Sequence, residues 1–144
     1  MNLALKRQFS KQYANNYVET AVSEATPHKL IEMLYEGAIK NINLAKVFIE
    51  QKNHGKKAEH INKALAILNA LRAGVDTGKG GEVAENLYNL YDYCYRTLFN
   101  ASVKNDFTLL SEVLEHIVLV SEAWKEMPEN FKRVSKEQLD KVKS

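Results

Sequence analysis

Residues 26–52 read TPHKLIEMLYEGAIKNINLAKVFIEQK, and this stretch decides the fold because it opens with a clear helix start. Thr26 can cap the helix, and Pro27 suits its first position because the amide hydrogen that proline lacks would have no partner there. Apolar side chains then recur every three or four residues, the period of a helix with one buried face. They are Leu30, Leu34, Ala38, Ile42, Ala45 and Ile49. We therefore expect a helix from Pro27 to about Lys52.

Three further helices are expected downstream, over residues 56–75, over residues 82–105 and from the cap residue Asp106 to Pro128. No proline lies between Pro27 and Pro128, and four of the six glycines lie within residues 74–81, where residues 76–81 are expected to form a loop. Helices of about twenty residues joined by short loops predict an all-α fold, an antiparallel up-and-down four-helix bundle.

The two ends of the chain are expected to differ from the bundle. We expect one domain over residues 1–127, with an N-terminal arm or short cap helix at 1–25 and the four helices at 26–127. Residues 128–144 carry five basic and three acidic side chains. They predict a basic tail that is flexible or weakly helical.

The overall composition narrows the class of protein. The chain has 144 residues, of which 45% are hydrophobic and 26% charged, enough for one globular domain with a core. Lys and Arg number 20 against 18 Asp and Glu, too balanced for a surface built to bind nucleic acid. No apolar run reaches the length of a membrane span, and Met1 to Phe9 do not read as a signal peptide. A soluble cytoplasmic protein without membrane insertion is expected.

No catalytic, cofactor or metal site is expected from the sequence. Cys94 is the single cysteine, so an internal disulfide and a multi-thiolate site are excluded, and it falls on an apolar helix face. Glu112 and His116 are four residues apart, whereas the di-iron bundle motif requires three. The glycines of residues 74–81 lack the spacing of a phosphate-binding loop and follow a helix. The chain is therefore not expected to be an enzyme.

Two of the expected helices carry more apolar surface than one buried face needs. In the helix over 82–105, a second stripe of aromatic side chains lies beside the face of Leu87, Cys94 and Leu98. This stripe comprises Tyr88, Tyr91, Tyr95 and Phe99. The first helix has a similar excess at Ile31, Tyr35, Ile39 and Ile42. Two interpretations stay open: either all of this surface is core, covered in part by residues 10–25, or one face receives a partner helix.

Six segments in order along the chain carry a further pattern: Tyr13–Asn15, Thr26–Ala38, Lys79–Leu87, Leu90–Tyr93, Asn105–Asp106 and Glu122–Lys125. Together they resemble the flagellar secretion chaperone family, FliS, over about residues 10–127. Glu36 departs from this pattern, since an aspartate is common there, and a dozen extra residues precede Tyr13.

The resemblance implies an antiparallel helical bundle with a short N-terminal cap. It implies a cytoplasmic chaperone that binds the C-terminal segment of newly made flagellin, blocks premature filament assembly and delivers flagellin to the export gate protein FlhA. It also implies regulatory partners in some relatives, an anti-sigma factor and a small flagellin-binding regulator.

We therefore expect the second faces of the helices over 27–52 and 82–105 to form a groove on which the disordered flagellin segment folds. The N-terminal arm would shield this groove when it is empty. The expected partner-binding residues are Tyr13, Tyr17, Val18, Ile31, Leu34, Tyr35, Ile42, Leu87, Tyr88, Tyr91 and Tyr95. The alternative is a helical scaffold or regulatory protein that uses the same surface for a different partner helix.

Overall fold

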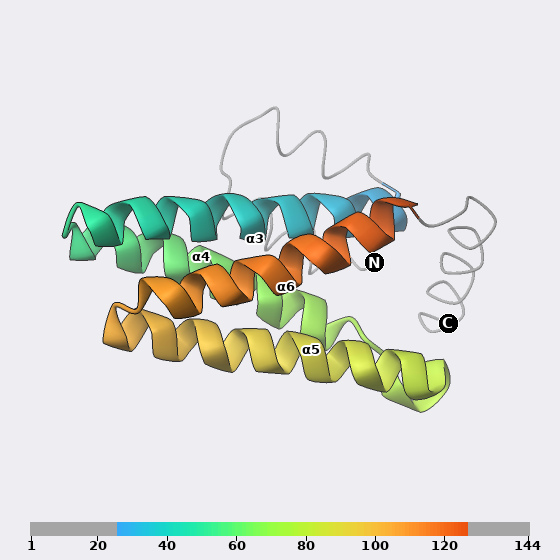
Figure 1. Cartoon of the computed structure of the whole chain (residues 1–144). Helices are drawn as coiled ribbons and strands as arrows, with labels where there is room; N and C mark the ends of the chain where they lie inside the picture. Colours follow the sequence, from blue (N-terminus) through green and yellow to red (C-terminus); the bar gives the residue numbers. More distant parts are fainter. Residues whose placement is uncertain (1–25, 127–144) are drawn as a thin grey trace.

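A computed structural model describes residues 26–126, which form four α-helices that alternate in direction (Figure 1). They are α3 (Pro27–Glu50), α4 (His54–Ala73), α5 (Thr77–Lys104) and α6 (Phe107–Glu126). The expected all-α helical bundle is confirmed. The expected arm at residues 1–25 and tail at 128–144 lie outside the described residues.

The helix starts follow the capping residues that the sequence predicts. The Oγ1 of Thr26 accepts a hydrogen bond from the Lys29 amide at 3.1 Å, and Pro27 occupies the first turn of α3. At the start of α6, the Oδ1 of Asp106 accepts from the Leu109 amide at 3.1 Å. Each cap satisfies an amide that has no partner within its own helix.

The expected loop at residues 76–81 is wrong, because helical structure begins at Thr77. The Oδ1 of Asp76 accepts hydrogen bonds from the amides of Gly78 and Lys79, which closes a first turn. Gly81 then interrupts the helix with φ 64° and ψ −147°, a backbone conformation that glycine adopts readily and other residues do not. The longer body of α5 therefore starts at Glu82, as predicted, but a capped turn precedes it.

The order of the helices around the bundle decides which faces can meet. Among the described helices, α3 packs on α4 and α6, and α5 packs on the same two helices. In Figure 1, α3 lies along the top of the bundle and α5 along the bottom. The two helices that carry excess apolar surface therefore occupy opposite corners of the bundle.

The core is made of the apolar seams of all four helices. Side chains that are 1% exposed or less come from each helix, including Leu30, Ile61, Leu98 and Val113. Burying a side chain of this size stabilises the fold by about 1.5–3 kcal/mol relative to leaving it in water. Cys94, 1% exposed, lies in the same core, and burial raises the pKa of its thiol to about 12.

Two tyrosines meet inside the bundle. Tyr35 of α3 is 1% exposed and Tyr91 of α5 is 5% exposed, with their rings 6.4 Å apart. Their hydroxyls hydrogen-bond to each other, which avoids the cost of two buried polar groups without partners. Burial raises the pKa of Tyr35 to about 12 and raises that of Tyr91 well above 10. Both phenols are therefore neutral core groups.

Candidate partner-binding surface

Four of the residues expected to bind a partner are core residues instead. They are at most 5% exposed: Leu34, Tyr35, Ile42 and Tyr91. The broad apolar stripe of α3 is buried because that helix packs on two neighbours, α4 and α6, and also faces the interior of the bundle. The hydroxyl pair between Tyr35 and Tyr91 allows the two rings to be buried together. The expectation that these four side chains line an open groove is corrected accordingly.

A single groove between α3 and α5 is also absent from the described part of the chain, because the two helices lie at opposite corners. Ile31 on α3 and Leu87 on α5 are half-buried against the core and lie on these separate helices. Tyr13, Tyr17 and Val18, predicted to belong to a shielding arm, lie outside the described residues. The described residues therefore provide no groove that is shared by α3 and α5.

The aromatic surface that remains open belongs to α5. Tyr88 is 39% exposed, Phe99 is 54% exposed and Tyr95 is half-buried. Steps of seven and four residues place these three rings on one face of the helix, over about 16 Å of its length. We call Tyr88, Tyr95 and Phe99 the aromatic face. Val103, four residues after Phe99 and 67% exposed, continues it toward the end of α5.

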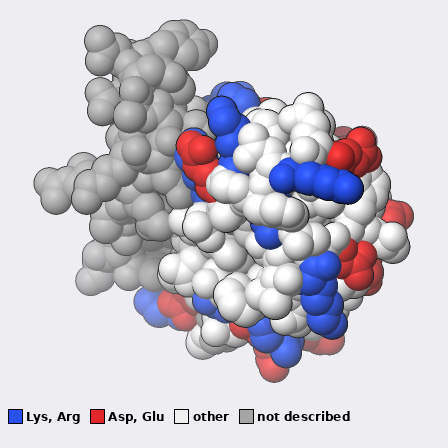
Figure 2. All heavy atoms as spheres, turned by 90° about the vertical axis from the view of Figure 1, so that its left-hand side faces the viewer, with Lys and Arg blue, Asp and Glu red and all other residues white. Residues whose placement is uncertain are grey.

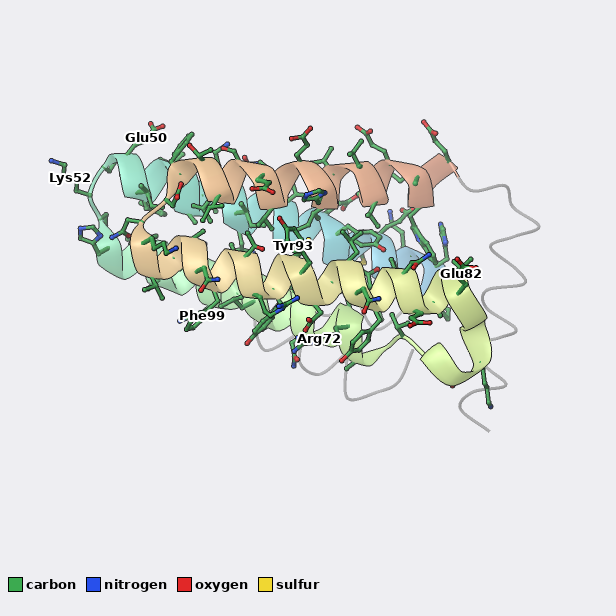
Figure 3. The ribbon with its side chains drawn as sticks, turned by 60° about the horizontal axis from the view of Figure 1, so that its bottom comes forward. Glu50, Lys52, Arg72, Glu82, Tyr93 and Phe99 are labelled. Atoms are coloured by element: carbon green, nitrogen blue, oxygen red, sulfur yellow. The ribbon has the colours of Figure 1, made fainter. Side chains whose placement is uncertain are left out.

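The aromatic face borders α4. The guanidinium of Arg72, from α4, lies 4.6 Å from the centre of the Tyr95 ring. Figure 3 shows Arg72 and Phe99 on the same side of α5, whereas Tyr93 lies on the side toward α6. The face therefore looks outward along the line where α4 and α5 meet, in a cation–π contact with the neighbouring helix.

On its side of this line, α4 presents Arg72 together with shorter, uncharged side chains. Asn69 accepts a hydrogen bond at 2.9 Å from Nη2 of Arg72, so the two residues share this side of α4. Helical steps of seven residues place Asn62 and Leu65 along the same side, one exposed and the other 9% exposed. The aromatic face of α5 thus lies beside Arg72 and these side chains of α4.

The side of α5 toward α6 is occupied by polar contacts. The Tyr93 hydroxyl donates to Oε1 of Glu112 at 2.8 Å, and its ring meets the His116 ring edge-on at 5.6 Å. The hydrogen bond to the carboxylate raises the pKa of Tyr93. Glu112 and His116 are thus engaged by a tyrosine, and residues 26–126 contain no group of three ligand side chains that could hold a metal ion.

A cavity of about 10 Å³ lies between the helices, with walls that include Leu68, Tyr91, Cys94 and Ile117. Its volume holds about one water molecule. The cavity is a packing defect in the core and too small to receive a ligand or a side chain of a partner.

On the end of the bundle with the α3–α4 and α5–α6 turns, Lys and Arg side chains are interspersed with Asp and Glu on a described surface made largely of other residues (Figure 2). Interspersed charges produce no strong long-range field to steer a partner. In addition, none of the four described helices combines the length and apolar composition needed to cross a bilayer. The aromatic face is therefore the strongest candidate surface for a partner.

Sequence reasoning missed two contacts that position the helices. Nζ of Lys57, 8% exposed, donates to the Ser102 carbonyl at 2.8 Å and to Oδ1 of Asn105 at 2.7 Å, which ties α4 to the end of α5. At the opposite end, the Trp124 indole stacks on His28 at 4.7 Å and donates to its carbonyl at 3.1 Å. A lysine within a helix carries no sequence signal of such a role.

Comparison with known proteins gives consistent matches. A family model described as "Flagellar protein FliS" matches residues 9–130. "Flagellar secretion chaperone FliS" of Salmonella typhimurium is 45% identical over 118 residues, which cover 81% of this chain and 87% of that protein. "Flagellar secretion chaperone FliSB" of Pseudomonas aeruginosa is 37% identical over 114 residues, 79% of this chain and 90% of that protein. The Bacillus subtilis "Flagellar secretion chaperone FliS" is 36% identical over 110 residues, covering 76% and 81% respectively.

Proposed function

The chain belongs to the FliS family of flagellar proteins, whose named relatives are secretion chaperones and not enzymes, and we propose that it binds flagellin. In this proposal the chain acts in the cytoplasm on the C-terminal segment of newly made flagellin. It prevents premature polymerisation and accompanies flagellin to the export gate protein FlhA. An anti-sigma factor or a regulator of flagellin level would be an additional partner.

The observation that carries the proposal is the exposed aromatic face of α5. Tyr and Phe side chains bury a large area and lose little rotamer freedom when a partner covers them. Their spacing over about three helical turns suits the apolar stripe of an amphipathic helix, which has the same period. The exposed rings of Tyr88 and Phe99 would supply the surface against which such a helix lies.

Binding to a disordered segment also explains how the client can be released. A segment that folds on its chaperone loses conformational entropy, which lowers the affinity by about 2–5 kcal/mol relative to a rigid ligand of equal contact area. Such a segment can extend around the bundle. We expect Ile31 and Leu87 to contribute only where it reaches beyond the aromatic face, and Tyr13, Tyr17 and Val18 to shield the surface when it is empty.

Calorimetric titration with the C-terminal segment of flagellin tests the proposal. We expect saturable binding, a negative heat-capacity change and a gain of helix measured by circular dichroism. Phe99→Ala is expected to weaken the affinity about tenfold, as for a partly exposed aromatic contact residue. Tyr93→Ala, on the side toward α6, is the matched control and should leave the affinity nearly unchanged.

Two results would contradict the proposal. Absence of binding at several temperatures would favour the alternative, a helical scaffold or regulator with another partner helix. Equal losses for Phe99→Ala and Tyr93→Ala would mean that the aromatic face is not the binding surface.

A further inference from the structure

A charge cluster lies within the aromatic face. Asp92 is one helical turn from both Tyr88 and Tyr95, so it shares their side of α5. Its Oδ1 lies 2.8 Å from Nη1 of Arg72, and its Oδ2 lies 3.0 Å from Nε of Arg96. One carboxylate thus stands between two guanidinium groups, and the cluster carries a net positive charge.

The two arginines are held very differently. The Arg72 side chain is 22% exposed, binds Asp92 and Asn69, and covers the Tyr95 ring. The Arg96 side chain is 69% exposed, and apart from Asp92 its guanidinium has no ion-pair or hydrogen-bond partner among residues 26–126. A guanidinium carries five N–H donors, so Arg96 retains donors for an additional acceptor.

The neighbouring acidic groups do not cancel this charge. Glu85 lies on the same side of α5 but eleven residues before Arg96, about 16 Å along the helix and beyond the screening length in physiological salt. Glu59 on α4 is paired with Lys63 at 3.7 Å. The unbalanced charge beside the rings therefore belongs to Arg96.

We propose that the helix bound on the aromatic face carries an Asp or Glu at the border of its apolar stripe, and that this carboxylate pairs with Arg96. Arg96 is then a specificity-determining residue, and Arg72 is the positioning residue that holds Asp92 and the Tyr95 ring. This inference rests on the proposed function, since it names the chemistry of the segment that the surface accepts.

The physical reason is the position of Arg96 at the edge of an apolar surface. When a helix covers the rings, water is excluded from the adjacent ion pair, and the attraction between opposite charges is less screened than at an open surface. An arginine can also hold a carboxylate through two parallel hydrogen bonds, which adds geometric selectivity. A basic helix at the same place would be repelled, so the pair selects among amphipathic segments of similar hydrophobicity.

The test is a charge-reversal experiment with the full chain and the C-terminal segment of flagellin as the probe. At about 50 mM salt, Arg96→Glu is expected to weaken binding about tenfold and Arg96→Gln about threefold, with both losses shrinking as salt is raised. Lys104→Glu reverses a charge on another side of α5 and should leave the affinity nearly unchanged. Replacing the acidic residues of the probe one at a time by Lys should identify one change that restores binding to Arg96→Glu.

The outcomes separate this inference from the function on which it rests. Wild-type binding with no loss in Arg96→Glu, or with no rescuing change in the probe, would overturn the pairing and leave the proposed function standing. Failure of the unsubstituted chain to bind the probe would overturn both. Circular dichroism of each variant serves as the folding control, and the exposed position of Arg96 predicts unchanged helix content.

Discussion

Tyr91 and Tyr95 lie four residues apart on α5, yet they belong to different regions of the molecule. Tyr91 is 5% exposed and hydrogen-bonds to Tyr35 across the interior. Tyr95 is half-buried at the surface beneath the guanidinium of Arg72. Adjacent turns of one helix therefore divide between the interior of the bundle and the surface that we propose for a partner.

The same contrast holds between the two helices that carry excess apolar surface. In α3 the second stripe packs into or against the core, since Tyr35 and Ile42 are at most 1% exposed. Its other two members, Ile31 and Ile39, are partly buried against the core. In α5 the second stripe remains at the surface as Tyr88, Tyr95 and Phe99. The width of an apolar stripe shows how much surface a helix has to hide, and the neighbouring helices determine how much of it they cover.

The largest loss of stability is expected on substituting Tyr91, the buried residue of this comparison. Tyr91→Ala is expected to lower the free energy of unfolding by about 3–5 kcal/mol, because it leaves a cavity and deprives the Tyr35 hydroxyl of its partner. Urea denaturation measures the loss. Tyr91→Phe keeps the ring and should cost only about 1 kcal/mol. A loss below about 1 kcal/mol for Tyr91→Ala would mean that the ring is not part of the core.

The next effect tests whether the contact at the end of α5 holds that helix in the bundle. Lys57→Met removes the hydrogen bonds to the Ser102 carbonyl and Asn105, and we expect a loss of about 1–3 kcal/mol in urea denaturation. Lys56→Met is the matched control on the exposed neighbour and should cost less than about 0.5 kcal/mol. Equal losses would remove the special role of Lys57.

A smaller loss of stability is expected on replacing Gly81, the residue at which the backbone of α5 departs from helical angles. Gly81→Ala should cost about 1 kcal/mol because alanine is strained at positive φ, and an added Cβ there meets nothing within 4 Å. Gly78→Ala lies in the capped turn at ordinary backbone angles and should be neutral or slightly stabilising. Thermal denaturation of both variants measures the difference, and a stable Gly81→Ala variant would contradict the strained geometry.

The smallest expected effect is the pH dependence of stability that His60 causes where α4 packs on α3. His60 stacks on Phe48 at 5.4 Å, and its Nδ1 lies 2.9 Å from Oδ1 of Asn41. Burial, followed by the nearby Lys63 charge, lowers the pKa of His60 below 6.5 in the folded state. The contribution of neutral His60 to the free energy of unfolding is therefore present above pH 6.5. It is lost as the pH falls toward the pKa of His60 in the folded state.

In His60→Gln, the free energy of unfolding should therefore depend less on pH than in the unsubstituted protein, over a range from pH 7.5 to below pH 6.5. The measurement is a series of urea denaturations at stepped pH. Identical pH profiles for the two proteins would contradict the folded-state shift.

Local signals in the sequence predicted the fold well. Thr26 and Asp106 mark helix starts because a capping side chain acts on its own first turn, and the apolar period identifies the seam containing Leu30 and Leu98. The turn that precedes Gly81 was missed because glycines usually favour a loop, whereas here Asp76 caps a helical turn.

Which side chains are buried and which stay at the surface was predicted less well, because this depends on contacts between helices. Short loops make consecutive helices neighbours, so the first and third helices of such a bundle must lie diagonally, and this signal was available to rule out a groove between them. The pairing of Asp92 with Arg96 is also readable from their i,i+4 spacing. The position of Arg72 over Tyr95 depends on the register between α4 and α5, which no local pattern specifies.

Titration of the flagellin C-terminal segment into Tyr95→Ala, with Tyr91→Phe measured in parallel, tests the central contrast most directly. We expect Tyr95→Ala to bind about tenfold more weakly. Its free energy of unfolding should fall by about 1–2 kcal/mol, less than for Tyr91→Ala, because the ring is only partly packed on the core. Tyr91→Phe should lose stability and keep its affinity. A Tyr95→Ala variant that binds as tightly as the unsubstituted protein, or that unfolds in place of losing affinity, would contradict the assignment of that ring to partner binding.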